Sequence, residues 1–273
     1  MPLITLTSDI GKQDYLSAAV KGVLMKMDPS FQLVDVTHEL HPFNDSQAAY
    51  VIRNTIKQFP AGTFHIILVN LFQYPPEHML LVKHRDQYLC LADNGLITMI
   101  LEETPEQVVA LPLDKSYHRN TLYCTEVMGR AIAAVATGKT LPQLGDASVS
   151  IQVRNPLRPL TTGNSIEGQI IFIDHFENVI VNITRDDFEA QRKGRRFKIA
   201  FKRDEVIDKL SETYADVPEG EKLALFNSAG YLEIAVNKGN AAGLFGLQGF
   251  SEKNISQYTQ SRLFYQTIRV FFE

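Results

Sequence analysis

The sequence predicts an α/β fold, with an N-terminal, mostly parallel sheet covered by helices on both faces and a smaller C-terminal antiparallel β domain. In the first half, short apolar runs alternate with stretches whose apolar residues recur every three or four positions. Strands that alternate with helices form mostly parallel sheets. From Glu167 onward the apolar runs are joined by short connections, which is typical of antiparallel strands.

The elements of the first half follow from this alternation. Helical spacing predicts helices at residues 15–27, 46–59 and 125–136, the first capped by Asp14 and the second by Asp45 or Ser46. Strands are expected at residues 3–6, 32–37, 63–69, 79–82, 88–92 and 108–112. Open α/β sheets bind ligands at the carboxyl ends of their strands. Asp9 and Asn70 lie at such ends, and Asp93 and Asn94 are further candidates for this edge.

Prolines interrupt the pattern between Gly138 and Gly163, which predicts a linker with some extended structure. We therefore expect an N-terminal domain over residues 1–162 and a C-terminal domain over residues 163–273. Strands of the second domain are expected at residues 169–173, 179–183, 197–201, 222–226, 231–235 and 267–272, with a short helical turn near residue 241.

Composition excludes several classes of protein. The chain has 273 residues and a formal net charge of -4, with acids and bases interspersed, whereas nucleic-acid binders usually carry a clustered basic face. We interpret the basic run at residues 192–196 as a solvated hairpin or loop. No apolar stretch approaches the ~20 residues of a membrane span, and the first residues do not form a signal peptide. A cytoplasmic protein without a membrane or nucleic-acid partner is expected.

The cysteines and histidines give no strong signal. Cys90 and Cys124 have no disulfide or metal spacing, and Cys124 is interpreted as a buried thiol rather than one activated by a helix N-terminus. His38 and His41 lack the further ligands that a metal site needs, so they are interpreted as structural or solvent-facing. No metal is expected.

The segment LTSDIGKQD contains Asp9 and lacks both the dinucleotide fingerprint and the P-loop. A carboxylate at such a turn can accept hydrogen bonds from two adjacent hydroxyls, as on a ribose, or can cap the loop.

In IFIDHFENVIVNI, Asp174 could pair with an ammonium, Phe176 could stack on a base and Asn178 could bind a purine edge. Alternatively, these residues only serve a hairpin turn. In LFNSAGYLEIAVNKGNAAGLFG, the turn at Ser228 could bind a carboxylate through its backbone amides, or it is a plain strand connection.

Taken together, these segments resemble the S-adenosyl-L-methionine hydroxide adenosyltransferase family, which is related to the fluorinase and chlorinase enzymes. Further matching pieces occur in the family's order over nearly the whole chain: LVDVTHELHPF, AAYVIRNTIKQFPAGTFHIILV and LADNGLITMIL. The resemblance implies a homotrimer whose ligand lies between one subunit's N-terminal domain and its neighbour's C-terminal domain. It implies that Asp9 binds the ribose, Asp174 the methionine amino group, Phe176 and Asn178 the adenine, and Ser228 the methionine carboxylate.

The resemblance fails at the family's Asp-Arg-His set, which handles the attacking water. The chain has VNLFQYPPEH where the family has valine-aspartate-proline-glycine-valine-glycine and then arginine, and it has TLYCTE where the family has the histidine. The aspartate thus becomes Asn70, the arginine falls on Glu77 or, with a one-residue slip, on His78, and the histidine becomes Tyr123.

Two main hypotheses follow. The leading one is an enzyme that transfers the adenosyl group of S-adenosyl-L-methionine to water with an altered water site, because loss of a base typically slows a reaction by about 10²–10⁴-fold without abolishing it. The alternative is a non-catalytic binder of S-adenosyl-L-methionine or adenosine. Another nucleophile such as halide is a remote alternative, since Phe72 and Gln73 do not resemble a small dry halide pocket. No cofactor is expected, and S-adenosyl-L-methionine is substrate or ligand.

Overall fold

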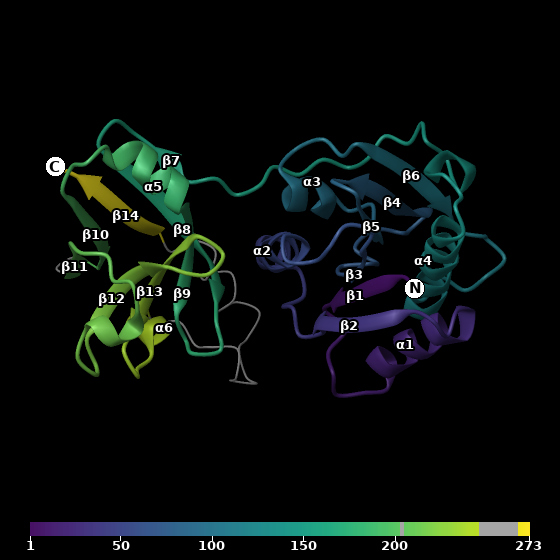
Figure 1. Ribbon diagram of the computed structural model, residues 1–273, viewed down its shortest axis with the longest axis horizontal. Helices are drawn as coiled ribbons and strands as arrows, with labels where there is room; N and C mark the ends of the chain where they lie inside the picture. Colours follow the sequence, from purple (N-terminus) through teal and green to yellow (C-terminus); the bar gives the residue numbers. More distant parts are fainter. Residues whose placement is uncertain (203–204, 246–266) are drawn as a thin grey trace. The chain divides into compact units, whose positions relative to one another are not determined.

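The computed structural model describes residues 1–202, 205–245 and 267–273. The chain divides into two compact units, Met1–Pro156 and Leu157–Glu273, which we call the first and second units (Figure 1). None of the helices in these described ranges is long and apolar enough to cross a membrane.

The first unit is built on a six-stranded sheet of order β2-β1-β3-β5-β4-β6. Its strands are β1 (Leu3–Ser8), β2 (Gln32–Thr37), β3 (Phe64–Leu68), β4 (His78–His84), β5 (Gln87–Ala92) and β6 (Gln107–Pro112). Strands β2, β1, β3 and β5 pair in parallel, and β4 runs antiparallel to both of its neighbours. The predicted mostly parallel sheet is confirmed.

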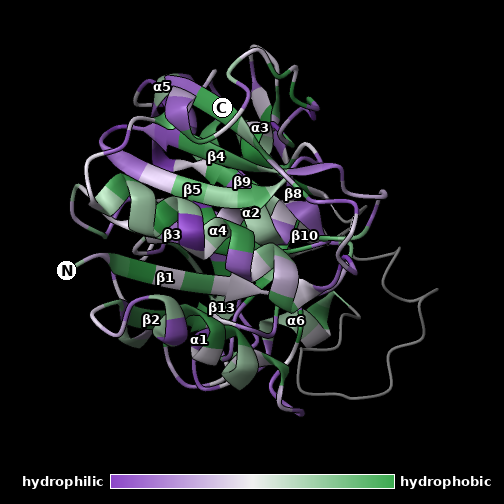
Figure 2. Cartoon of the chain, turned by 90° about the vertical axis from the view of Figure 1, so that its right-hand side faces the viewer, coloured by the Kyte–Doolittle hydropathy of each residue, from purple (hydrophilic) through white to green (hydrophobic). Residues whose placement is uncertain are grey.

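Helices cover both faces of this sheet, as predicted. Helices α1 (Leu16–Met27) and α4 (Thr121–Ala136) pack on one face, and α2 (Asp45–Ile56) and α3 (Leu96–Leu101) on the other. Successive residues of a strand point to opposite faces. Accordingly, Ile66 of β3 belongs to the core under α1 and α4, and Ile67 to the core under α2 and α3. Figure 2 shows long hydrophobic stretches along the central strands, including β1.

A close approach joins the two helices on the first face. A Cβ at Gly129 of α4 would lie 2.6 Å from the Met27 Sδ and 2.8 Å from the Leu24 Cδ2 of α1. A larger residue at position 129 would therefore require the Met27 and Leu24 side chains to shift, and glycine lets them pack directly on α4.

Three boundary predictions in the first unit were wrong. Helix α2 is capped by Asn44, whose side chain accepts the N–H of Gln47 at 3.0 Å, so neither Asp45 nor Ser46 caps it. Tyr15 occupies the N-cap position of α1, although the Asp14 carboxylate accepts the N–H of Leu16 at 2.8 Å.

Helix α4 begins one turn earlier than predicted, because Asn120 caps it through the N–H of Tyr123 at 2.9 Å. Two short elements of the first unit were not predicted: α3, whose six residues are nearly all apolar, and the 3-10 helix η1 (Leu141–Gln143).

The second unit is an antiparallel sheet of order β11-β10-β14-β8-β9-β13-β12, with β7 beside β8. Its strands are β7 (Leu160–Thr161), β8 (Ser165–Ile173), β9 (Val179–Thr184), β10 (Phe197–Lys202), β11 (Glu205–Ile207), β12 (Lys222–Phe226), β13 (Tyr231–Val236) and β14 (Thr267–Phe272). The helices are α5 (Arg185–Arg192), the 3-10 helix η2 (Tyr214–Asp216) and the predicted helical turn α6 (Ala241–Leu244). The expected antiparallel β fold is confirmed.

Helix α5 was not predicted, because seven of its eight residues, RDDFEAQR, are polar or small. Its single large apolar residue, Phe188, is fully buried against the rings of Phe197, Phe226 and Phe272. A capping box between Thr184 and Asp187 was the available signal for the start of this helix.

The basic run at residues 192–196 ends α5 and leads into β10. It was predicted to be a solvated hairpin or loop, and residues 193–196 form the connection between α5 and β10. Two of the arginines in the run also lie over aromatic rings. The guanidinium carbon of Arg192 is 5.2 Å from the ring centre of Phe197, and that of Arg195 is 5.2 Å from the ring centre of Phe272. These two arginines therefore pack on rings of the second unit's aromatic core.

Candidate functional site

Three neighbouring parallel strands of the first unit end in polar residues. Asp9 follows β1, Asn70 lies two residues after β3, and Asp93 and Asn94 follow β5. Because β1, β3 and β5 are adjacent in the sheet, these residues lie at one edge of it. This is the edge where open α/β sheets bind ligands, as the sequence predicted.

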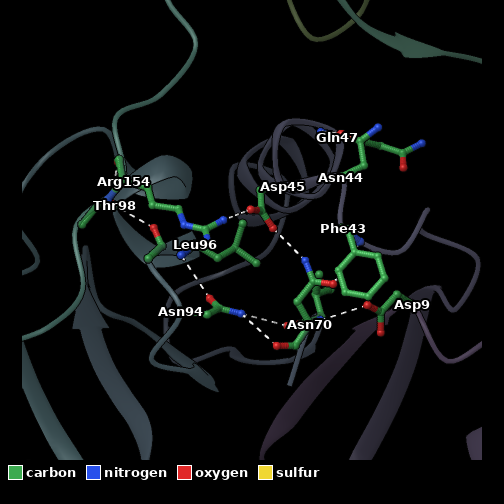
Figure 3. Close-up of polar contacts among 12 residues, drawn as sticks. Asp9, Phe43, Asn44, Asp45, Gln47, Asn70, Asn94, Leu96, Thr98 and Arg154 are labelled. Atoms are coloured by element: carbon green, nitrogen blue, oxygen red, sulfur yellow. Dashed lines mark hydrogen bonds and ion pairs between the residues drawn. The ribbon is translucent and has the colours of Figure 1, made fainter. Parts of the chain in front are cut away.

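Asn70 is the centre of this group (Figure 3). Its backbone has a left-handed φ of 49°, and its N–H donates to Oδ2 of Asp9 at 2.9 Å. The side-chain amide of Asn94, which is buried, donates to the backbone carbonyls of Val69 at 3.1 Å and Asn70 at 3.3 Å. The turn after β3 is therefore fixed from both sides.

The side chain of Asn70 is hydrogen-bonded at both ends of its amide. Oδ1 accepts the backbone N–H of Phe43 at 3.0 Å, and Nδ2 donates to Oδ1 of Asp45 at 2.7 Å. These two contacts assign the amide orientation, since a flipped amide would oppose donor to donor. Asp45 is available for this role because Asn44, and not Asp45, caps α2.

Asp45 also forms an ion pair with Arg154, through its Oδ2. The backbone of Arg154 is held by the Thr98 hydroxyl, which accepts the Arg154 N–H at 2.9 Å and lies 2.8 Å from the Arg154 carbonyl. A chain of contacts thus leads from Arg154 through Asp45 and Asn70 to Asp9 (Figure 3).

Asp9 is half-buried at this edge. Burial raises the pKa of its carboxyl, and the negative charge of Asp45 raises the pKa further, whereas backbone hydrogen bonds from Asn70 and from Asp9 itself lower it. A carboxylate has about four lone-pair positions, so the Asn70 N–H leaves Asp9 able to accept hydroxyl protons of a ligand. The geometry therefore fits the ribose role proposed for Asp9 from the sequence.

Phe43 lies beside Asp9 and Asn70 in Figure 3. Its ring is 73% exposed although its backbone φ is 62°, an uncommon value for a bulky residue. The hydrogen bond from its N–H to Asn70 holds this conformation. An exposed apolar ring on a constrained backbone next to a candidate ligand-binding carboxylate is typical of a binding surface.

The other residues at the positions of the Asp-Arg-His set contact different parts of the first unit from those that Asn70 contacts. Glu77 is exposed, and its backbone carbonyl accepts the N–H of Leu113 at 3.2 Å. His78 begins β4, and its Nε2 is 3.3 Å from Oδ2 of Asp93.

Tyr123 is buried in the first turn of α4, where its ring stacks on Tyr117 with centroids 5.3 Å apart. Its hydroxyl oxygen accepts the backbone N–H of Asp114 at 2.8 Å. Because the oxygen is the acceptor in this contact, the hydroxyl proton remains available to a second partner.

The structure agrees with the interpretation of Cys124 as a buried, unactivated thiol and of His38 as a structural residue. Burial raises the pKa of Cys124 to about 11, although the charge of Arg119 opposes this, so the thiol is not activated. His38 is buried, with Nδ1 2.7 Å from the Ser8 hydroxyl and Nε2 3.1 Å from Asp35. Within the described ranges there is no cluster of three or more side chains that could hold a metal ion.

In the second unit, the candidate residues Asp174, Phe176 and Asn178 share the turn between β8 and β9. Oδ1 of Asp174 accepts the backbone N–H groups of Phe176 at 2.9 Å and Asn178 at 2.8 Å, and Oδ2 accepts the Asn178 side-chain amide at 3.0 Å. The Asp174 carboxylate therefore organises the turn, while the Phe176 ring projects from it with 73% of its surface exposed. The Asp174 carboxylate can therefore hold the turn in shape while Phe176 stays exposed to a ligand.

A second carboxylate accompanies Asp174. Glu233 of β13 is only 2% exposed, and its Oε1 accepts the Tyr214 hydroxyl at 2.6 Å. Burial raises the pKa of Glu233, and the charge of Asp174 raises it too, whereas the hydrogen bond from Tyr214 lowers it. Two neighbouring carboxylates favour a cation, which fits the ammonium role expected of Asp174.

Ser228 is exposed in the turn between β12 and β13. Oδ1 of the preceding Asn227 accepts the N–H groups of Ala229 at 3.0 Å and Tyr231 at 3.1 Å, so the turn is ordered by Asn227. This leaves the Ser228 side chain at the surface, as a ligand contact requires.

Sequence reasoning missed four residues of the first-unit site: Phe43, Asp45, Asn94 as an anchor of the turn, and Arg154. The available signal was HPFND, which places an aromatic ring and an acid just after the predicted second strand. No local signal marked Arg154, which is 109 residues away from Asp45 in the chain.

Comparison with known proteins decides the family. Two family models match, described as the SAM hydroxide adenosyltransferase N-terminal domain over residues 4–145 and the SAM hydroxide adenosyltransferase C-terminal domain over residues 168–252. The chain belongs to the SAM hydroxide adenosyltransferase family. This confirms the resemblance inferred from the sequence.

Relatives of this SAM hydroxide adenosyltransferase family member match it over most of their length. An (R)-S-adenosyl-L-methionine hydrolase from Thermus thermophilus is 30% identical over 256 residues, which cover 88% of this chain and 94% of the relative. A fluorinase from Actinopolyspora mzabensis is 26% identical over 283 residues, which cover 90% of this chain and 94% of the relative. An uncharacterized conserved protein from Thermotoga maritima has the same fold, with a TM-score of 0.80 at 24% identity over 99% of this chain and 100% of that one.

Proposed function

We propose that the protein binds S-adenosyl-L-methionine and transfers its adenosyl group to water, yielding adenosine and L-methionine. Membership in the SAM hydroxide adenosyltransferase family and similarity to (R)-S-adenosyl-L-methionine hydrolases support this. The observation that carries the proposal is Asp9, a half-buried carboxylate fixed by the Asn70 N–H at the ligand-binding edge of the sheet.

The reaction is an in-line displacement at C5′ of the ribose. A water oxygen forms the new bond to C5′ while the C5′–S bond breaks, and its electron pair neutralises the sulfonium to give the thioether of methionine. One proton of the water is released to solvent, and the other remains on the new 5′-hydroxyl of adenosine. Since the leaving group is already activated, the residues act by aligning the water and the ribose.

Each candidate ligand-binding residue has a role in this proposal. Asp9 accepts the two ribose hydroxyls, and Asp174, with Glu233 behind it, attracts the methionine ammonium. Phe176 and Asn178 bind the adenine, and Ser228 binds the methionine carboxylate.

The water site is the altered part. Both ends of the Asn70 amide are occupied, so Asn70 stabilises the site and the water must be oriented mainly by other groups. Tyr123 retains a proton with which to orient a water, but its ordinary pKa near 10 makes it a poor base. We therefore propose slow turnover, about 10²–10⁴-fold below an enzyme with a positioned base.

We further propose a homotrimer with sites at subunit interfaces, as the family resemblance implies; Asp9 belongs to the first unit of the chain and the remaining ligand residues to the second. A cytoplasmic location without a cofactor stays a prediction. Light scattering of the purified protein would test the trimer through its mass.

The decisive experiment incubates the purified protein with S-adenosyl-L-methionine, follows adenosine and methionine by chromatography, and measures binding by calorimetry. Release of both products in equal amounts supports the enzyme. Binding without turnover would make the protein a non-catalytic binder of the same ligand. Absence of both would refute the proposal.

A further inference from the structure

We propose that Arg154 is a positioning residue for Asp9, acting through Asp45 and Asn70. The inference rests on the proposed function, because it concerns the residue expected to bind the ribose of the adenosyl group. The proposal adds the Asp45–Arg154 ion pair to the binding site, and neither residue is at a water-handling position of the family.

The first argument is the continuity of the contacts. The Arg154 guanidinium pairs with Oδ2 of Asp45, and Oδ1 of the same carboxylate accepts the Asn70 side chain at 2.7 Å. The backbone N–H of Asn70 then holds Asp9 at 2.9 Å. Each link uses a different atom, so the three contacts coexist and form one chain of hydrogen bonds.

The second argument is charge. Asp45 and Asp9 are both acids and approach the same residue, Asn70, from different elements. The Asp45 carboxylate disfavours ionisation of Asp9, and it would do so more strongly without a cation beside it. Arg154 supplies this cation. The other charged and titratable side chains of the loops near Asp9 are engaged elsewhere: Lys12 pairs with Glu39 at 3.8 Å, and His38 binds Ser8 and Asp35.

The third argument is the space provided for Arg154. Gly95 has a φ of 86°, and a Cβ there would lie 2.5 Å from Cγ and 2.9 Å from Cδ of Arg154. The aliphatic part of the arginine thus crosses the glycine backbone on its way to Asp45. Together with the Thr98 contacts, this holds the arginine in one path.

The fourth argument is the identity of residue 70. The neutral amide of Asn70 accepts from Phe43 and donates to Asp45 at the same time. An aspartate at this position would oppose its carboxylate to that of Asp45. Asn70 differs from the family's water-handling aspartate, and its amide supplies the neutral donor that the Asp45 carboxylate needs beside Arg154.

The test measures adenosine affinity by calorimetry from about pH 4 to about pH 8 in four proteins: wild type, Arg154→Gln, Asp45→Asn and the double variant. At neutral pH, Arg154→Gln should weaken binding about tenfold, because Asp45 loses its cation and Asn70 its fixed partner. Affinity should also fall at a higher pH than in the wild type, since an uncompensated Asp45 makes Asp9 harder to ionise.

The pH profile separates positioning from a merely structural effect. Asp45→Asn and the double variant should both lose affinity at a lower pH than Arg154→Gln, because neither retains the Asp45 charge. Arg154→Lys should recover part of the affinity. Arg130→Gln removes an exposed arginine that pairs with Glu126 on α4, and it should match the wild type.

The outcomes are distinguishable. If the wild type binds neither adenosine nor S-adenosyl-L-methionine, the proposed function fails. If the wild type binds and Asp9→Ala does not, yet Arg154→Gln keeps both the affinity and the pH profile, the positioning role is wrong and the proposed function stands. Asp45→Asn is nearly isosteric, so it provides the pH test even if Arg154→Gln folds poorly.

Discussion

The backbone N–H of Asn70 donates a hydrogen bond to the Asp9 carboxylate across 61 residues of sequence, at 2.9 Å. The bond joins the turns that follow two adjacent parallel strands, β1 and β3. It prepares Asp9 before any ligand arrives, which lowers the entropy that binding must overcome.

Asp9→Asn should weaken adenosine binding by roughly 100-fold, because hydrogen bonds to a charged group contribute about 1.5–3 kcal/mol each. Calorimetric titration with adenosine measures this. Asp86→Asn is the matched control, since Asp86 lies in a turn with a side chain that is 79% exposed. Equal affinity of Asp9→Asn and wild type would remove Asp9 from the ribose site.

The same Asp9→Asn change should stabilise the ligand-free protein near pH 7, raising its Tm by roughly 1–3 °C. The folded protein raises the Asp9 pKa, so keeping this group ionised costs stability above that pKa. As the pH falls below the ordinary value of about 3.9, Asp9 is protonated in both states and the gain should vanish. A gain that does not change with pH would contradict this account.

Asn70→Asp should lower the Tm by several degrees, because it places a carboxylate against Asp45 where an amide now donates at 2.7 Å. Combining it with Asp45→Asn restores a donor and an acceptor, and most of the Tm should return. Thermal unfolding measures both effects. Additive losses in the double variant would show that the two side chains do not interact.

Phe176→Ala should weaken adenosine binding about 10-fold or more, since aromatic–base stacking contributes about 1–3 kcal/mol per base. It should leave the unfolding free energy nearly unchanged, because the ring is 73% exposed. Phe271→Ala on β14, also an exposed ring, is the control. Unaltered affinity in Phe176→Ala would move the adenine elsewhere.

Tyr214→Phe should destabilise the second unit by about 1–3 kcal/mol at neutral pH, because it removes one of the donors to the buried Glu233 carboxylate. Glu233 already has a raised pKa, and loss of this donor raises it further. The destabilisation should therefore shrink as the pH falls and Glu233 is protonated. Urea unfolding at several pH values measures it, with Tyr15→Phe as an exposed control.

The strand ends of the site could be predicted from sequence because they depend on local patterns. Alternating apolar runs located β1 and β3, and the residues that follow them had to be at the carboxyl edge. The cap of α2 was not predictable in the same way. Asn44, Asp45 and Ser46 are all good caps, and only the contacts of Asp45 with Asn70 and Arg154 decide among them.

Short elements and distant partners were beyond local reasoning. The apolar run of α3 satisfies a strand as well as a helix, and its six residues are too few to resolve the period. Arg154 reaches the site from a segment without regular structure, so neither periodicity nor motif indicated it.

The passage of Arg154 over Gly95 also restricts how this protein can diverge. A side chain at position 95 would force the arginine to shift and would strain the backbone, which would weaken the hold on the acid at 45 and on the amide at 70. Four positions that are far apart in the sequence thus depend on one another, and we expect a change at one of them to disturb the other three.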